Sequence, residues 1–151
     1  MRALVEKLIE KKLTIASCES FTVGLFGAGL GSVSGASNTY KGTLVTYQTV
    51  IKTDVLKVDH QLVKEYGVVS ETIAKEMCLK GKNYFNSDIC VSFTGNAGPE
   101  AMENKPVGLI YIGINYLGKI ATYEYRLVGS RAMIQKQAVH IAEKKLLDML
   151  G

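Results

Sequence analysis

Hydrophobic and polar positions follow one another along this chain in two spacings, and each spacing predicts a different element. The first segment, residues 2–12, places Leu4, Val5, Leu8 and Ile9 on one stripe, with glutamate and lysine opposite. Apolar residues three and four positions apart share one face of a helix, so this spacing predicts an amphipathic helix. The chain therefore opens on a helix that needs a core to cover its apolar side.

Short apolar runs predict the strands. Five such runs, rich in β-branched or aromatic residues, lie at 13–20, 43–48, 89–93, 107–115 and 119–127. The last two alternate polar and apolar residues on either side of Leu117-Gly118, a pattern typical of an antiparallel hairpin. The sequence thus predicts four or five strands, two of them joined directly.

Helix signals separate the strands. The small apolar stretch 21–30 predicts a buried helix, and residues 50–56 are compatible with a short one. Asp59, Ser70 and Ser130 are N-cap residues that predict helices ending near residues 66, 84 and 149. Helices between strands, together with the late hairpin, predict an α/β fold: a three-layer α/β/α sandwich around a mixed central sheet.

Composition and charge narrow the function classes. The 151 residues, 47% hydrophobic and 21% charged, have room for a single globular domain over 1–151. Eighteen Lys+Arg against 14 Asp+Glu give a net charge of +4, and these charges are interspersed. Direct nucleic-acid binding favours a concentrated basic face, so no nucleic-acid partner is expected.

Cysteine usage and apolar runs indicate a cytoplasmic protein. The three cysteines, Cys18, Cys78 and Cys90, are odd in number and form no CxxC pair, which favours a reduced compartment. The first residues lack a signal-peptide core. The longest apolar run, 107–118, is shorter than the ~20 residues of a membrane span. We therefore expect neither secretion nor membrane insertion.

Sequence signals for metals and organic cofactors are missing. His60 and His140 lie far apart, and neither belongs to a metal-binding motif. The chain has no dinucleotide-binding glycine fingerprint after a strand and no phosphate-binding P-loop motif. The sequence predicts chemistry that uses side chains alone, with no cofactor.

Candidate reactive residues follow the predicted strands. Ser20 lies where the first strand enters a helix, a corner whose N–H groups suit an anion or an oxyanion. The alternative is that Ser20 or Thr22 only caps that helix. Tyr47 and Lys52 follow the second strand, although an isolated pair of this kind is also typical of an ordinary amphipathic surface.

Two further segments have the character of a binding site. In Thr94-Gly-Asn-Ala-Gly-Pro99 a hydroxyl and two glycines allow close approach of backbone to a ligand, or form a simple tight turn. Arg131 begins the last predicted helix, where its charge opposes the helix dipole. Because this position is electrostatically unfavourable, we expect Arg131 to have another role, such as binding an anionic partner.

Taken together, these segments resemble the C-terminal domain of the competence/damage-inducible CinA family, over nearly the whole chain and in the correct order. Around the candidate nucleophile, Cys18-Glu-Ser-Phe-Thr-Val-Gly-Leu25 is similar to the family's A-E-S-C-T-G-G-L. Other matches are Gly35-Ala-Ser37 to G-S-S, Val45 through Lys52 to V-x-Y-S-N-E-x-K, Gly67–Glu71 to G-A-V-S-E, Thr94–Pro99 to T-G-I-A-G-P, Lys105–Gly108 to K-P-V-G and Gly129–Arg131 to G-D-R.

The family includes stand-alone nicotinamide-nucleotide amidases, so the resemblance implies hydrolysis of the carboxamide of nicotinamide mononucleotide, a step of NAD recycling. It implies Ser20 as nucleophile, Lys52 as its base and Tyr47 as a proton relay or orienting partner. The substrate-binding residues that it implies are Thr22, Gly24, Gly35, Ser37, Thr94, Gly95 and Arg131. It also implies a pyridine-nucleotide partner and a homo-oligomer.

The chain departs from the family motifs beside the reactive residues. Val23 replaces a glycine, and a β-branched residue obstructs any role that needs a positive φ. Gln48–Ile51 lacks the asparagine and the glutamate that the family motif has before its lysine, which makes the surroundings of Lys52 more apolar. The alternative function is therefore a CinA-like module of weak or no activity, which binds a nucleotide or a recombination protein in competence or DNA damage.

Overall fold

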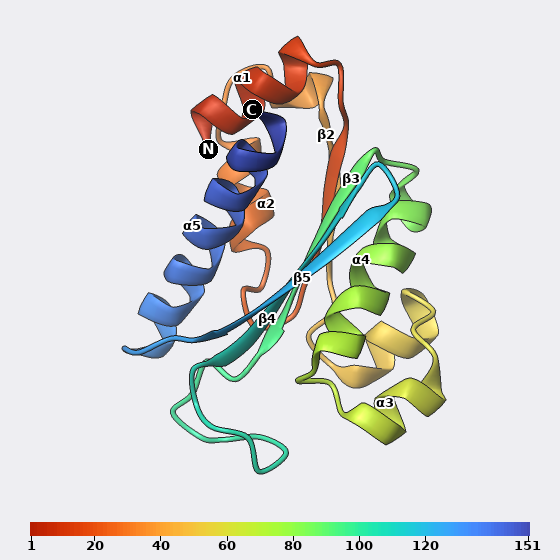
Figure 1. Cartoon of the computed structure of the whole chain (residues 1–151), viewed down its shortest axis with the longest axis vertical. Coiled ribbons are helices and arrows are strands. Elements are labelled where there is room, and N and C mark those ends of the chain that lie inside the picture. The colour runs from red at the N-terminus through yellow and green to blue at the C-terminus, as the bar shows by residue number, and fades with distance from the viewer.

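A computed structural model describes all residues, 1–151, and contains one sheet of five strands (Figure 1). The strands are β1 (Ile15–Glu19), β2 (Tyr40–Val45), β3 (Ile89–Gly95), β4 (Leu109–Tyr116) and β5 (Lys119–Arg126), in the order β2-β1-β3-β4-β5. β1 pairs in parallel with β2 and β3, whereas β4 pairs antiparallel with β3 and β5. The predicted mixed sheet with its late hairpin is confirmed.

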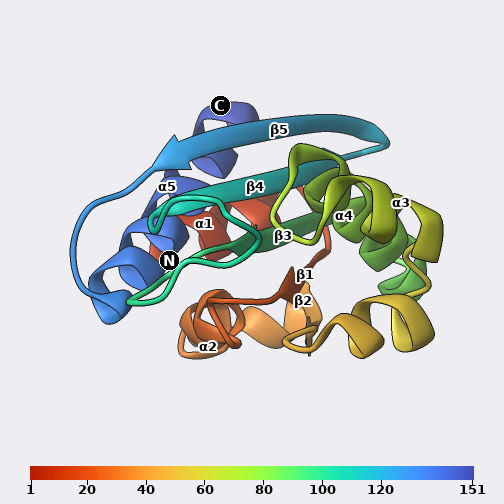
Figure 2. The same ribbon diagram turned by 90° about the horizontal axis from the view of Figure 1, so that it is seen from below.

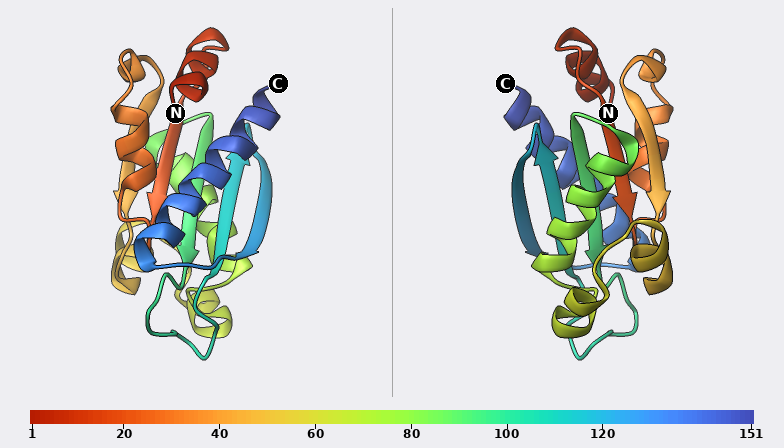
Figure 3. Two further views of the ribbon diagram at one scale, coloured as in Figure 1. Left: turned by 90° about the vertical axis from the view of Figure 1, so that its left-hand side faces the viewer. Right: turned by 90° about the vertical axis from the view of Figure 1, so that its right-hand side faces the viewer.

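Helices cover both faces of this sheet, which gives the three predicted layers (Figures 2 and 3). One face carries α1 (Arg2–Glu10), α2 (Leu25–Gly31) and α5 (Arg131–Leu150). The other carries α3 (His60–Tyr66) and α4 (Glu71–Phe85), with α4 packed on β1, β3, β4 and β5. None of the helices has the length and apolar character that crossing a membrane requires.

The predicted helix starts are confirmed by their caps. Each N-cap side chain accepts a hydrogen bond from a backbone N–H two or three residues ahead: Asp59 from Gln61, Ser70 from Ile73 and Ser130 from Met133. Such bonds satisfy N–H groups that the first helical turn leaves without a partner. Local sequence therefore fixed where α3, α4 and α5 begin.

Three segments differ from the prediction by more than two residues or in the type of element. α2 begins at Leu25 rather than at residue 21, because residues 21–24 form a turn. β2 begins at Tyr40 rather than 43; Gly42, with φ +146°, makes room there for the ring of Phe85, and glycine in a strand weakens its pattern. Residues 51–55 form a π-helical turn, which periodicity does not distinguish from an α-helix.

The larger core lies between the sheet and α1, α2 and α5, and includes Leu8, Phe26, Phe93, Ile112 and Leu146. A smaller one lies under α4. The carboxyl ends of the parallel strands meet at one edge, where the loop of residues 96–108 projects (Figure 1). Both chain termini lie at the opposite end (Figure 1).

Candidate functional site

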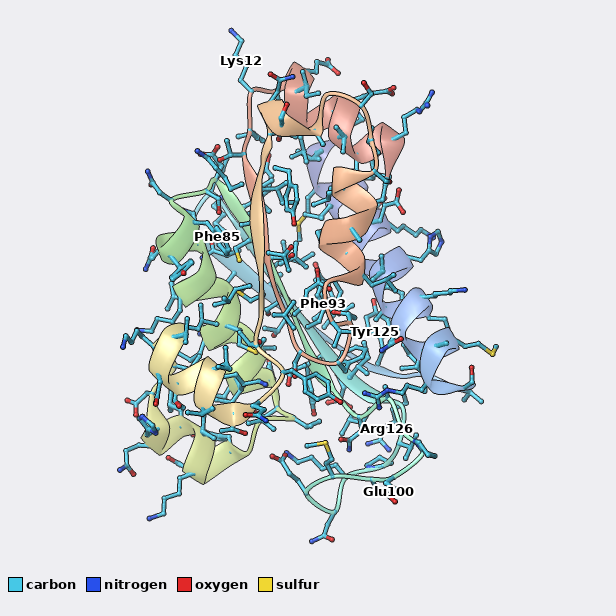
Figure 4. The ribbon with its side chains drawn as sticks, turned by 180° about the vertical axis from the view of Figure 1, so that it is seen from behind. Lys12, Phe85, Phe93, Glu100, Tyr125 and Arg126 are labelled. Carbon is cyan, nitrogen blue, oxygen red and sulfur yellow. The ribbon has the colours of Figure 1, made fainter.

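A cavity of about 130 Å³ lies at the carboxyl ends of the parallel strands. Of the residues that the sequence nominates, six line it: Ser20, Tyr47, Lys52, Thr94, Gly95 and Arg131. Glu100, on the projecting loop, also lines the cavity; Figure 4 shows it at one end of the molecule and Lys12 at the other. Segments more than 100 residues apart in the chain thus meet around one hollow.

Ser20 and Lys52 are in direct contact. The Lys52 Nζ donates to Ser20 Oγ at 3.0 Å and also to the backbone oxygen of Thr46. Lys52 is only 1% exposed, and burial lowers the pKa of its amine from 10.5 to about 8, while the charge of Glu103 acts in the opposite sense. Near neutral pH this amine therefore loses its proton far more readily than an exposed lysine does.

Ser20 is held at the end of β1 by backbone pairing. Its N–H donates to Phe93 O at 3.0 Å, and its own carbonyl accepts from Val23 N at 3.2 Å, which closes a tight turn. The N–H groups of Phe21 and Thr22, inside this turn, donate to no protein acceptor. They are the free donors nearest to the Ser20 hydroxyl in sequence.

Glu19 is a residue that the sequence analysis missed. Its side chain is fully buried and accepts hydrogen bonds from the hydroxyls of Ser17 and Thr22 and from the N–H groups of Phe26 and Gly27. The N–H groups of Phe26 and Gly27 in the first turn of α2 therefore bind Glu19 and are not free to bind an oxyanion, so the free N–H groups of this corner are those directly after Ser20. The available signal was an acidic residue at the last position of an otherwise buried strand.

Tyr47 and Arg131 meet at the rim of the cavity. The Arg131 guanidinium donates to the Gly98 carbonyl at 2.8 Å and to Tyr47 Oη at 3.1 Å. Tyr47 is 55% exposed, and its hydroxyl contacts Arg131 rather than Ser20 or Lys52. Tyr47 Oη therefore makes no hydrogen bond with either member of the Ser20–Lys52 pair.

The end of β3 forms the floor of the cavity. Thr94 Oγ1 donates to Val68 O at 2.6 Å, which commits its proton and leaves lone pairs for a ligand. Gly95 packs so closely on Ile110 that a Cβ would lie 2.6 Å from a side-chain carbon. Asn96, which the sequence analysis did not single out, donates from Nδ2 to carbonyls of the projecting loop, including those of Met102 and Lys105.

Four of the nominated substrate-binding residues lie outside the cavity. Thr22 is fully buried, and its hydroxyl donates to Glu19 Oε2 at 2.7 Å. Gly24 is the N-cap of α2 in the left-handed conformation and faces Val45. Gly35 and Ser37 precede β2, at the far end of the sheet, where a Cβ on Gly35 would contact Ile9 of α1.

Val23 adopts a backbone conformation that is typical of glycine, the residue that the family motif has at this position. Its φ is +44°, in the left-handed region that β-branched residues rarely occupy. The side chain is 50% exposed and does not line the cavity. The replacement therefore strains the turn after Ser20 without filling the space that a ligand needs.

Comparisons with known proteins agree with this architecture. The family model described as CinA C-terminal domain matches residues 1–150. A Listeria innocua protein named as competence-damage inducible is 44% identical over 124 residues, which are 82% of this chain and 30% of that protein. A Levilactobacillus brevis protein of the same name is 38% identical over 137 residues, 90% of this chain and 33% of its own length. The chain thus spans about a third of the curated relatives it matches.

Solved structures match over nearly the whole chain. A CinA superfamily protein from Klebsiella pneumoniae has a TM-score of 0.96 at 28% identity, covering 99% of this chain and 94% of its own. An Escherichia coli member of the superfamily has a TM-score of 0.95 at 28% identity, covering 98% and 87%. The arrangement of layers described above is shared with both structures.

Proposed function

Since the chain belongs to the CinA C-terminal domain family, we propose that it hydrolyses the carboxamide of nicotinamide mononucleotide to nicotinate mononucleotide and ammonia. One observation carries the proposal. The hydroxyl of Ser20 lies 3.0 Å from a buried amine whose pKa is lowered to about 8. A serine needs an adjacent base to attack an amide, and a neutral lysine supplies one.

The chemistry proceeds in two stages. Lys52 takes the Ser20 proton as Oγ bonds to the carboxamide carbon, and it then gives that proton to the departing nitrogen, which leaves as ammonia. Water attacks the resulting ester and loses one proton to Lys52, which returns it to Ser20 Oγ as the bond between Oγ and the acyl carbon breaks; the acid product leaves and gives its remaining proton to solvent. The free N–H of Phe21, a residue that lines the cavity, is the candidate oxyanion donor, with a contribution of roughly 2.7–4 kcal/mol.

The shape and charge of the site suit this substrate. A cavity of about 130 Å³ is small for a whole nucleotide, which favours entry of the pyridine ring and its carboxamide alone. Ribose and phosphate would then extend to the rim, where Arg131 lies beside Tyr47. A forked guanidinium is well suited to phosphate oxygens.

The test is release of ammonia from nicotinamide mononucleotide by the purified chain between neutral and alkaline pH. Ser20→Ala is expected to abolish release, and Ser32→Ala, which removes an exposed hydroxyl bonded to Gly29 O, is the matched control. No release by the unmodified chain would overturn the activity. Equal release by Ser20→Ala would instead remove the nucleophile from the mechanism.

A second candidate is a nucleotide-binding module with weak or no turnover. Glu103 favours it, because the negative charge of this loop residue opposes the lowering of the Lys52 pKa and so retains protons on the base. Calorimetry distinguishes the two candidates: saturable binding of nicotinamide mononucleotide without ammonia release would select the module.

A further inference from the structure

We propose that Glu19 is a positioning residue, whose buried carboxylate holds the turn that presents Ser20 to Lys52. The inference rests on the proposed function in one respect only, that Ser20 is the nucleophile. It concerns how the hydroxyl is held, whatever amide the cavity receives.

The contacts of Glu19 enclose the reactive turn. Its Oε2 accepts from Thr22 Oγ1 at 2.7 Å and from Phe26 N at 3.2 Å, while its Oε1 accepts from Gly27 N at 2.8 Å. Ser20 and Phe21 lie between Glu19 and Thr22, so the first bond closes a small ring around them. The other two bonds fix that ring to the start of α2.

The backbone of Glu19 fixes the other partner. Its carbonyl accepts from Thr46 N at 2.8 Å, and the Thr46 carbonyl in turn accepts from Lys52 Nζ. One residue therefore holds the nucleophile through its side chain and the segment that orients the base through its main chain. A displacement of Glu19 changes the 3.0 Å contact between Ser20 Oγ and Lys52 Nζ from both sides.

The surroundings of Glu19 accept a carboxylate and disfavour an amide. Every side-chain contact is a donor, and Ser17 Oγ, which also donates to Oε1, continues the network to Thr43 Oγ1 and Tyr40 Oη. Gly27 permits this assembly, since a Cβ there would lie 2.1 Å from Thr43 Oγ1. In Glu19→Gln the new NH₂ meets the N–H of Phe26 or of Gly27, which can only donate, whichever way the amide is turned, so the turn must shift although the side chain keeps its size.

The experiment measures the reactivity of Ser20 directly, by the rate at which a fluorophosphonate labels it. In that reaction Oγ bonds to phosphorus, fluoride leaves and the serine proton passes to Lys52. Glu19→Gln is expected to slow labelling roughly tenfold or more, because misplacement of about an ångström is costly to such reactions. The pH midpoint of labelling should stay at that of the unmodified chain, since Lys52 remains the base.

Asp88→Asn is the matched control, because Asp88 is a carboxylate that accepts two hydrogen bonds from Thr14 at the other end of β1. Its labelling rate should lie within about twofold of that of the unmodified chain. All rates are measured at a temperature below the melting temperature of every variant. Should Glu19→Gln fail to fold, Thr22→Val compared with Thr14→Val removes one hydroxyl donor at each end. A slower rate is then expected for Thr22→Val alone.

The proposal is overturned if Glu19→Gln is labelled as fast as Asp88→Asn. Where Glu19→Gln does not fold, it is overturned if Thr22→Val is labelled as fast as Thr14→Val. An unmodified chain whose Ser20 is not labelled also overturns it, because there is then no activated hydroxyl to position. Rapid labelling without ammonia release from nicotinamide mononucleotide rejects the proposed substrate and leaves the role of Glu19 intact.

Discussion

Glu19 and Asp88 are carboxylates at opposite ends of the two central parallel strands, and they differ in what surrounds them. Glu19 is fully buried and gathers donors from β1, the turn and α2. Asp88 is partly exposed and accepts the N–H and hydroxyl of Thr14, at 2.8 and 2.7 Å, which ties the start of β1 to that of β3.

The difference separates two uses of the same group. Hydrogen bonding by the backbone of Thr14 lowers the pKa of Asp88, so the ionised form there stabilises the native sheet. Glu19 directly precedes Ser20, which lines the cavity, and one of its donors, Thr22, belongs to the turn that follows Ser20. One end of β1 is therefore built for attachment of strands, and the other for placement of a hydroxyl.

The largest effect is expected at the base. Lys52→Met should lower turnover of nicotinamide mononucleotide by roughly 10²–10⁴-fold, because no other amine contacts Ser20 Oγ. In the unmodified chain the rate should rise with pH through about 8, as Lys52 loses its proton. Both are measured by ammonia release. Lys64→Met, on the exposed side of α3, is the control and should retain the rate.

The same lysine predicts a pH dependence of stability. Its native pKa of about 8 lies below the usual 10.5, so the unfolded chain binds more protons between these values and native stability rises with pH across that window. Chemical denaturation at several pH values should show the rise in the unmodified chain and its loss in Lys52→Met. An equal rise in both would contradict the burial of this amine.

Next in size is removal of the buried carboxylate. Glu19→Ala should lower the free energy of unfolding by about 3 kcal/mol or more, because it leaves a hydroxyl and two N–H groups without acceptors. Denaturant titration measures this. A loss no greater than that of Asp88→Asn would erase the contrast between the two ends of β1.

A smaller loss is expected for Asp88→Asn, about 1 kcal/mol at neutral pH, since its contacts are fewer and partly exposed. Because the native pKa of Asp88 is lowered, its stabilisation is present above the unfolded pKa and disappears as pH falls through the native one. The difference between variant and unmodified chain should therefore shrink in acid. If the difference in free energy of unfolding were constant with pH, the charge of the Asp88 carboxylate would not be the cause of the stabilisation.

The smallest effect is expected in the turn itself. Val23→Gly should raise the free energy of unfolding by less than about 1 kcal/mol, since relief of the strained φ exceeds the added flexibility of the unfolded chain. Gly24→Ala, at φ +90°, should have the opposite sign. Thermal unfolding of both variants checks the pair, and destabilisation by Val23→Gly would show that the valine side chain contributes more than strain costs.

Local signals predicted much of this structure, and contacts across the sheet explain what they missed. The caps at Asp59, Ser70 and Ser130 act within three residues, so the sequence displays them. The role of Glu19 depends on α2 folding back over β1, which no spacing reveals. Gly35 and Ser37 follow α2 in the chain and lie at the far end of the sheet, because α2 carries the chain away from the cavity.

Placement of the ends of the chain has a practical consequence. Both termini emerge beside α1, whereas the projecting loop and the cavity lie at the other end of the sheet (Figure 1). A surface tether or a fusion partner joined at residue 1 or 151 would hold the molecule with the opening of the cavity facing away from the attachment. Immobilised protein should thus receive solutes as freely as protein in solution.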